Sequence, residues 1–139
     1  MGKLTALSPL VGRWSTTITM LYPTEQNGQQ FRAQDDYRWL PGENILVHEV
    51  IGEMNGEPVR SIEIYSSDES GHVQARSFDS SGDISDFRAT MVDGQWKIDG
   101  DTQRFASTSV TAEIIEGLWQ LRADGQWQDW MTVTLERQG

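Results

Sequence analysis

The sequence predicts an all-β protein: a single antiparallel up-and-down β-barrel of about ten strands. Glycine turn signals recur at short intervals, for example Asn27-Gly28, Asp93-Gly94 and Asp124-Gly125, and glycine in such turns takes the positive φ angle that a hairpin needs. The segments between turns are rich in β-branched and aromatic residues and alternate in polarity, as in residues 14–20 and 130–136. This is the period-two pattern of strands. Successive short hairpins without long crossovers favour a meander that closes on itself and so removes both sheet edges.

The individual elements follow from these turns in chain order. Residues 3–10 are expected to form a short helical turn packed across one end of the barrel. The strands are expected at 13–22, 31–40, 44–54, 58–67, 72–79, 83–92, 95–99, 102–110, 113–123 and 127–137. With no visible linker or repeat, residues 1–139 are expected to form one domain. A β-sandwich is the competing architecture, because alternation alone does not separate a sandwich from a barrel.

The inner face of each strand is assigned as the face that avoids burying an unpaired charge. In residues 44–54 that face carries His48 as its only polar side chain. Strand 58–67 is ambiguous, because Arg60 shares a face with Ile62. The residues expected to contact a bound molecule are Tyr37, Trp39, His48, Val50, Arg60, Phe87, Met91, Trp119 and Met131. This aromatic and methionine-rich lining is typical of a site for a small apolar or amphipathic molecule; the alternative is that these side chains simply fill the barrel.

Charge and composition exclude several classes of partner. The chain has 139 residues, 11 Lys and Arg against 21 Asp and Glu, and a formal net charge of −10. Its basic residues are scattered singly, so we expect binding to neither nucleic acid nor an anionic membrane surface. We expect no membrane-spanning helix and no secretory signal at the start. The absence of cysteine excludes disulfides and thiolate chemistry and favours the cytoplasm. The acidic residues, Asp35 and Asp36 among them, are interpreted as a solubilising exterior.

Few residues carry recognisable chemistry. No nucleophile elbow, phosphate loop or dinucleotide fingerprint is present, and His48 and His72 lack a third ligand for a metal, so no metal is expected. If the protein is an enzyme, the best catalytic candidates are His48 and Tyr37, as a general acid–base pair in an apolar lumen. The alternative is a structural His48 bonded to a hydroxyl of a neighbouring strand.

The first predicted strand opens with Leu10-Val11-Gly12-Arg13-Trp14. This run resembles the Gly-x-Trp signature of the calycin superfamily, which contains the lipocalin and fatty-acid-binding-protein barrels. The resemblance implies that Trp14 closes one barrel end against a basic side chain from a late strand. Arg137 or Arg122 could supply that partner by cation–π stacking.

A broader resemblance covers most of the chain. It is carried by Trp39-Leu40-Pro41-Gly42, Leu46-Val47-His48, residues 52–58, Phe78-Asp79-Ser80-Ser81-Gly82 and residues 130–137. These stretches resemble a bacterial family known only as a domain of unknown function, which is similar to lipocalins in fold and implies no activity. Haem-binding calycins of the nitrobindin type differ, because they have a glycine-rich first strand and a late-strand histidine. Haem bound through His48 is therefore not indicated, and no cofactor is expected.

Three functions compete on this basis. The first is the binding of a small hydrophobic ligand inside the barrel. The second is a cofactor-independent isomerase or cyclase acting on a hydrophobic substrate in the lumen, as in allene-oxide-cyclase-like barrels. The third is a structural or interaction module with a solid barrel, which forms a homodimer through outward apolar residues such as Ile114, Leu118 and Trp130.

Overall fold

The computed structural model describes residues 2–54, 56–68, 70 and 72–138. In this part of the chain, short helical segments α1 (Gly2–Thr5) and η1 (Ser8–Leu10) precede ten strands, and η2 (Thr24–Gln26) follows the first of them. The strands are β1 (Gly12–Met20), β2 (Gln30–Trp39), β3 (Leu46–Met54), β4 (Glu57–Ser67), β5 (Val73–Asp79), β6 (Ile84–Val92), β7 (Gln95–Asp99), β8 (Gln103–Val110), β9 (Ile114–Ala123) and β10 (Gln126–Arg137). Every expected strand is present, and its ends differ from the expected ones by no more than two residues.

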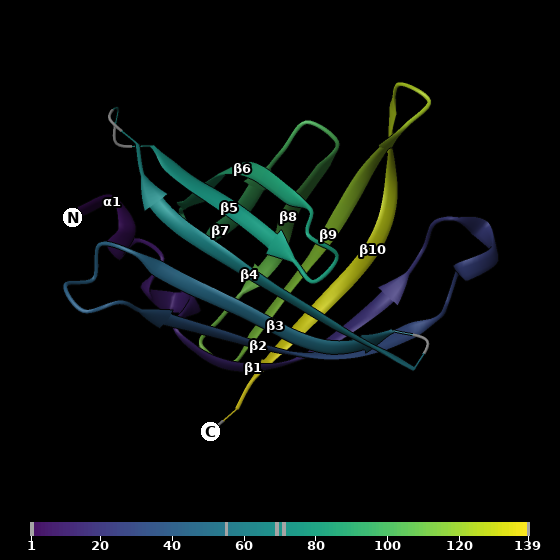
Figure 1. The fold of residues 1–139 in the computed structure, drawn as a ribbon, viewed down its shortest axis with the longest axis horizontal. Helices are drawn as coiled ribbons and strands as arrows, with labels where there is room; N and C mark the ends of the chain where they lie inside the picture. The colour runs from purple at the N-terminus through teal and green to yellow at the C-terminus, as the bar shows by residue number, and fades with distance from the viewer. Residues whose placement is uncertain (1, 55, 69, 71, 139) are drawn as a thin grey trace.

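The strands form one closed antiparallel barrel in which each pairs with its neighbours in sequence (Figure 1). Closure is made by β1 and β10, which pair from Trp14 opposite Arg137 to Met20 opposite Met131. Two of the expected hairpin turns, at Asp93-Gly94 and Asp124-Gly125, have positive φ at both residues. This conformation gives a two-residue turn the twist of the flanking strands. The up-and-down barrel is confirmed, and the sandwich is excluded.

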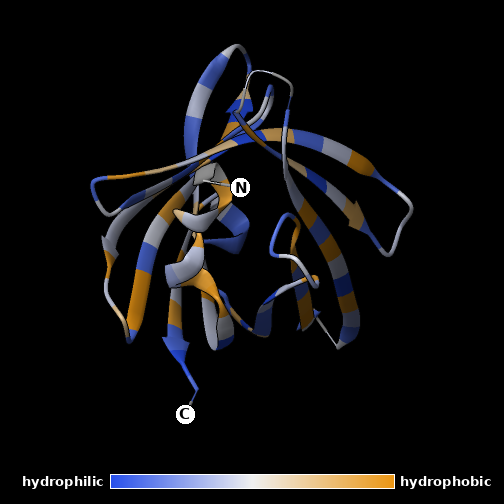
Figure 2. Cartoon of the chain, turned by 90° about the vertical axis from the view of Figure 1, so that its left-hand side faces the viewer, coloured by the Kyte–Doolittle hydropathy of each residue, from blue (hydrophilic) through white to orange (hydrophobic). Residues whose placement is uncertain are grey.

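The N-terminal segment covers one end of the barrel. Figure 2 shows its helical turns lying across the opening. Leu4 in α1, Leu7 between the two helical segments and Leu10 in η1 are spaced at intervals of three and are 2%, 0% and 0% exposed, so the segment buries one face against the barrel. The expected helical turn across one end is therefore confirmed. We call this the closed end.

A polar and aromatic clasp fixes the closed end. The indole Nε1 of Trp14 donates to the carbonyl of Leu10 at 2.8 Å, and the Arg137 guanidinium lies 4.2 Å from the Trp14 ring centroid. Arg137 also donates to the carbonyls of Pro9, Val11 and Ala112, at 2.8, 2.7 and 2.6 Å. Arg137 is thus the partner of Trp14, whereas Arg122, the other candidate, lies over Trp127.

The glycine of the Gly-x-Trp run has a steric explanation. Gly12 has a φ of 131°, and a Cβ placed on it would overlap the Arg137 guanidinium. A side chain there would be strained and would displace the arginine from its carbonyl partners.

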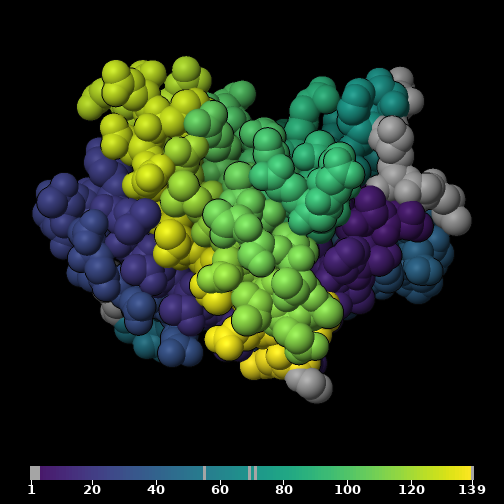
Figure 3. Space-filling view, turned by 180° about the vertical axis from the view of Figure 1, so that it is seen from behind, coloured from purple at the N-terminus to yellow at the C-terminus, as the bar shows by residue number. Residues whose placement is uncertain are grey.

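The interior is filled near the closed end and less completely toward the other. Tyr65, Trp96 and Leu46 are buried in the same core cluster as the leucines of the N-terminal segment. At the opposite end Met54 and Val59, which share the inward phase of their strands, are each 38% exposed. Figure 3 shows the back of the molecule, where the later strands form a continuous wall and the β9–β10 hairpin projects beyond it.

Gly117 gives the first testable prediction. It faces inward on β9, and a Cβ there would overlap the Phe105 ring and lie 2.8 Å from the carbonyl oxygen of Ala106. Gly117→Ala is expected to lower the free energy of unfolding by about 1–3 kcal/mol, because overpacking forces ring and backbone to shift. Urea unfolding measures the loss. Adding Phe105→Leu to Gly117→Ala should recover part of it, and an unchanged midpoint for Gly117→Ala alone would contradict the argument.

Candidate ligand-binding site

A cavity of about 270 Å³ lies inside the barrel. Of the nine residues expected to contact a bound molecule, six line it: Tyr37, His48, Val50, Phe87, Trp119 and Met131. Trp39 and Met91 are partly buried and pack against the core, but they do not line the cavity. The cavity also reaches Leu10 of the closed end.

Arg60 was expected to contact a bound molecule, although the inner face of its strand was ambiguous, and it does not line the cavity. The residue is exposed, and the neighbouring Ser61 and Glu63 line the cavity instead. The inward phase of β4 is therefore Ser61, Glu63 and Tyr65, while Ile62 is 40% exposed on the outer face. The alternation of polarity did not identify the inner face of β4, because its outer face carries isoleucines.

Trp130 was expected on the outer face and lines the cavity. The register of β10 against β9 shifts between Asp129 and Met131, so Trp130 is the extra residue of a bulge. Consecutive residues Trp130 and Met131 can therefore both face inward. Of the other residues proposed as an outer apolar patch, Ile114 is 38% exposed and Leu118 is half-buried.

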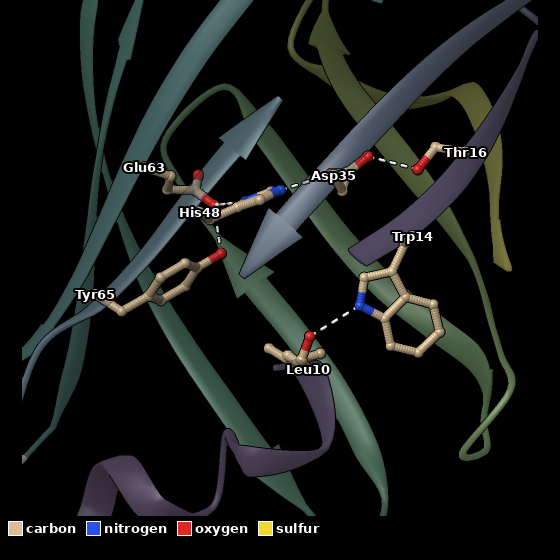
Figure 4. A network of polar contacts seen from close by, with 7 residues as sticks. All are labelled: Leu10, Trp14, Thr16, Asp35, His48, Glu63 and Tyr65. Atoms are coloured by element: carbon tan, nitrogen blue, oxygen red, sulfur yellow. Dashed lines mark hydrogen bonds and ion pairs between the residues drawn. The ribbon is translucent and has the colours of Figure 1, made fainter. Parts of the chain in front are cut away.

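His48 is held between two carboxylates from the strands on either side of β3 (Figure 4). Its Nε2 lies 2.6 Å from Asp35 Oδ2 on β2, and its Nδ1 lies 3.2 Å from Glu63 Oε1 on β4. In the barrel register, His48 is paired with Glu63 on one side and with Tyr37 on the other. Adjacent strands thus bring the imidazole and both carboxylates to one level of the inner wall.

Hydroxyl groups and a ring complete this cluster. Thr16 Oγ1 donates to Asp35 Oδ1 at 2.5 Å, and the Tyr65 hydroxyl donates to Glu63 Oε1. The Tyr37 ring stacks on the imidazole with the centroids 3.9 Å apart and the planes 8° from parallel. We call Thr16, Asp35, His48, Glu63 and Tyr65 the polar cluster.

The charge state of His48 follows from its two partners. Burial alone would lower its pKa, but the hydrogen bonds and negative charges of Asp35 and Glu63 outweigh burial and raise the pKa from 6.5 to about 9. At neutral pH the ring is therefore an imidazolium that donates from both nitrogens. Burial, together with the same carboxylates, raises the pKa of Tyr37 and of Tyr65 well above the usual value, so both phenols stay protonated.

Sequence reasoning missed Asp35 and Glu63. Asp35 is 7% exposed and is not part of the exterior to which it was assigned, because Thr16 and His48 compensate the burial of its charge. The sequence did indicate the inward orientation of Asp35, since Asp35 lies two positions from Tyr37 and therefore on the same face of the strand. Glu63 likewise shares a phase with Tyr65.

The arrangement restricts the chemistry that His48 can perform. It was expected to be either a functional group or a structural histidine bonded to a hydroxyl; its bonds go instead to carboxylates. Because both ring nitrogens donate, His48 in this state has no lone pair with which to accept a proton, which argues against a general-base role. Within the described ranges, no three His, Asp or Glu side chains are placed to hold a metal ion. His72 is exposed beside Asp68, in a turn away from the cavity.

The fold and the site together define a small β-barrel protein with an internal cavity. The chain belongs to the family described as "Protein of unknown function (DUF1579)", whose model matches residues 3–117. The expected membership of a family without an established activity is thereby confirmed. A search of the curated proteins finds no match.

Two solved structures show the same fold. The chain is similar to the S-type phycobiliprotein lyase CPES from Guillardia theta, with a TM-score of 0.64, 10% sequence identity, and coverage of 96% of this chain and 90% of that one. It is also similar to a de novo designed fluorescence-activating β-barrel, with a TM-score of 0.52, 10% identity, and coverage of 96% and 97%. No helix in the described residues is both long and apolar enough to cross a membrane.

Proposed function

We propose that this protein binds a small apolar or amphipathic molecule inside the barrel, with the polar part of the molecule directed at the polar cluster. The observation that carries the proposal is a cavity of about 270 Å³ whose apolar walls meet one set of buried polar side chains. Convergent polar groups in an apolar pocket fix the orientation of a ligand. Pockets for drug-sized ligands measure about 300–1,000 Å³, so this cavity suits a smaller molecule.

The position of the cluster supports this orientation. Along β3, His48 lies nearer the closed end than Val50, and both line the cavity. An amphipathic molecule entering from the opposite end would therefore pass Val50, Trp130 and Met131 before it reaches the polar cluster. The designed barrel described as fluorescence-activating and the phycobiliprotein lyase share this fold, which supports the use of such a barrel for small molecules.

Tryptophan fluorescence gives a direct test, because Trp96, Trp119 and Trp130 line the cavity. Titration with a panel of apolar dyes should change the emission, and Val50→Phe should weaken binding about tenfold by occupying the space that the dye needs. The matched control is Ile51→Phe, which adds a ring at the next residue on the outer face, where Ile51 is 47% exposed. Absence of any binding by calorimetry, or equal weakening by both variants, would contradict the proposal.

A further inference from the structure

We infer that the cavity selects molecules whose polar head is a hydrogen-bond donor, and above all a cationic amine, over molecules with a carboxylate head. This inference rests on the proposed function and names the class of ligand for the same site. Two independent observations carry it: the balance of charge around the cavity, and one carboxylate oxygen left without a partner.

The charges that face the cavity are predominantly negative. Asp35 and Glu63 contribute two carboxylates, with side chains 10% and 12% exposed, against the single positive charge of His48. No lysine or arginine is found among the described residues that line the cavity. Since His48 already uses both nitrogens on these carboxylates, it offers no free donor to an anionic head. A buried anion would therefore meet net repulsion in a medium of low dielectric.

The unused acceptor is Glu63 Oε2. Glu63 Oε1 accepts from both His48 and Tyr65, whereas both oxygens of Asp35 are taken, by Thr16 and His48. No hydrogen bond from the described part of the chain reaches Glu63 Oε2. None of the described side-chain oxygens that lack a partner is fully buried. Glu63 Oε2 is therefore not fully buried, and Glu63 lines the cavity with a side chain that is 12% exposed. Figure 4 shows this second oxygen free of the dashed contacts.

An ionised carboxylate only accepts hydrogen bonds, so a group that satisfies Glu63 Oε2 must donate. A protonated amine supplies both the donor and the compensating charge, and such charge-assisted bonds are roughly twice as strong as neutral ones. An alcohol supplies the donor alone. A carboxylate supplies neither and adds a third negative charge.

Three probes with one apolar body separate these heads: 1-naphthylmethylamine, 1-naphthylmethanol and 1-naphthoate. Their affinities are measured by calorimetry at pH 7 and about 150 mM salt, which screens the acidic exterior. We expect the amine to bind about tenfold more tightly than the alcohol, and the alcohol about tenfold more tightly than naphthoate. Equal affinities, or tightest binding of naphthoate, would overturn the inference and leave the binding function intact. Binding of none of the three would contradict both.

A pair of variants then distinguishes the cavity from the overall acidity of the protein. Glu63→Gln removes the charge beside His48, whereas Glu49→Gln removes one from the outer face of the adjacent strand β3, where Glu49 pairs with Arg38. Glu63→Gln should reduce the preference for amine over naphthoate about tenfold, and Glu49→Gln should leave it unchanged. Equal loss in both variants would assign the preference to bulk charge and overturn the inference. If Glu63→Gln does not fold, as judged by near-ultraviolet circular dichroism, the three wild-type affinities still decide the matter.

Discussion

Trp14→Ala is expected to lower the free energy of unfolding by about 3–5 kcal/mol, the range for removal of a large aromatic side chain from a core. Trp14 is 0% exposed and is the residue on which several parts of the closed end converge. Its indole holds the Leu10 carbonyl, and its ring supports the Arg137 guanidinium, which binds three further carbonyls. The substitution leaves a cavity and loosens the attachment of the N-terminal segment to β10.

Urea unfolding measures this loss, and Trp127→Ala is the matched control. Trp127 also lies under arginines, Arg104 at 4.2 Å and Arg122 at 5.4 Å from its ring centroid, but it is half-buried at the far end of β10. It should cost clearly less than Trp14→Ala. Equal costs for the two tryptophans would contradict the central role assigned to Trp14 at the closed end.

Asp35→Asn is expected to lower the free energy of unfolding by about 1.5–3 kcal/mol at pH 7, the range for loss of a hydrogen bond to a charged group. His48 keeps Glu63 as its counter-charge, but an amide in place of Asp35 removes the shorter of its two carboxylate contacts, at 2.6 Å. Asp36→Asn is the control: it is the adjacent residue, on the outer face, and its contact with Arg13 is exposed. Exposed pairs contribute about 0–1 kcal/mol, so a similar loss in both variants would contradict a special role for Asp35.

The same pair of variants has a pH signature. Because the pKa of His48 is raised from 6.5 to about 9 in the folded protein, protonation of the folded state is favoured. The resulting stability is fully present below pH 6.5 and is lost as the pH rises through about 9. Its full size is about 3 kcal/mol. In Asp35→Asn the decline between these pH values should shrink, and NMR titration of the His48 ring should give a lower pKa; an unchanged pKa would rule out the assigned cause.

The fold was accessible from the sequence because its determinants are local. Turns such as Asp93-Gly94 and the period-two alternation specify hairpins, and consecutive hairpins leave closure as the way to pair β1 with β10. The resemblance carried by the Gly-x-Trp run also indicated that Trp14 packs against a basic side chain from a late strand. These features depend on residues close together in the chain or on one repeating pattern.

The site was less accessible because it depends on pairs across strands. Asp35 and Glu63 are separated from His48 by 13 and 15 positions, and only the register shows that they compensate its charge. The rule that excludes carboxylates from the interior holds for unpaired charge, so it failed where the charge is paired. The outward orientation predicted for Trp130 was wrong for a different reason. A single bulge reverses which face the following residues point to, and the alternation of polarity does not reveal a bulge.

The N-terminal leucines also bear on where the proposed ligand would enter and leave the barrel. Because Leu4, Leu7 and Leu10 are buried across one end of the barrel, the proposed ligand would enter and leave at the opposite end, between the hairpin turns there. Attachment of the protein to a solid support ahead of Leu4 would therefore leave ligand association and dissociation rates unchanged. A bulky group on the β9–β10 hairpin, at the opposite end, would slow both rates.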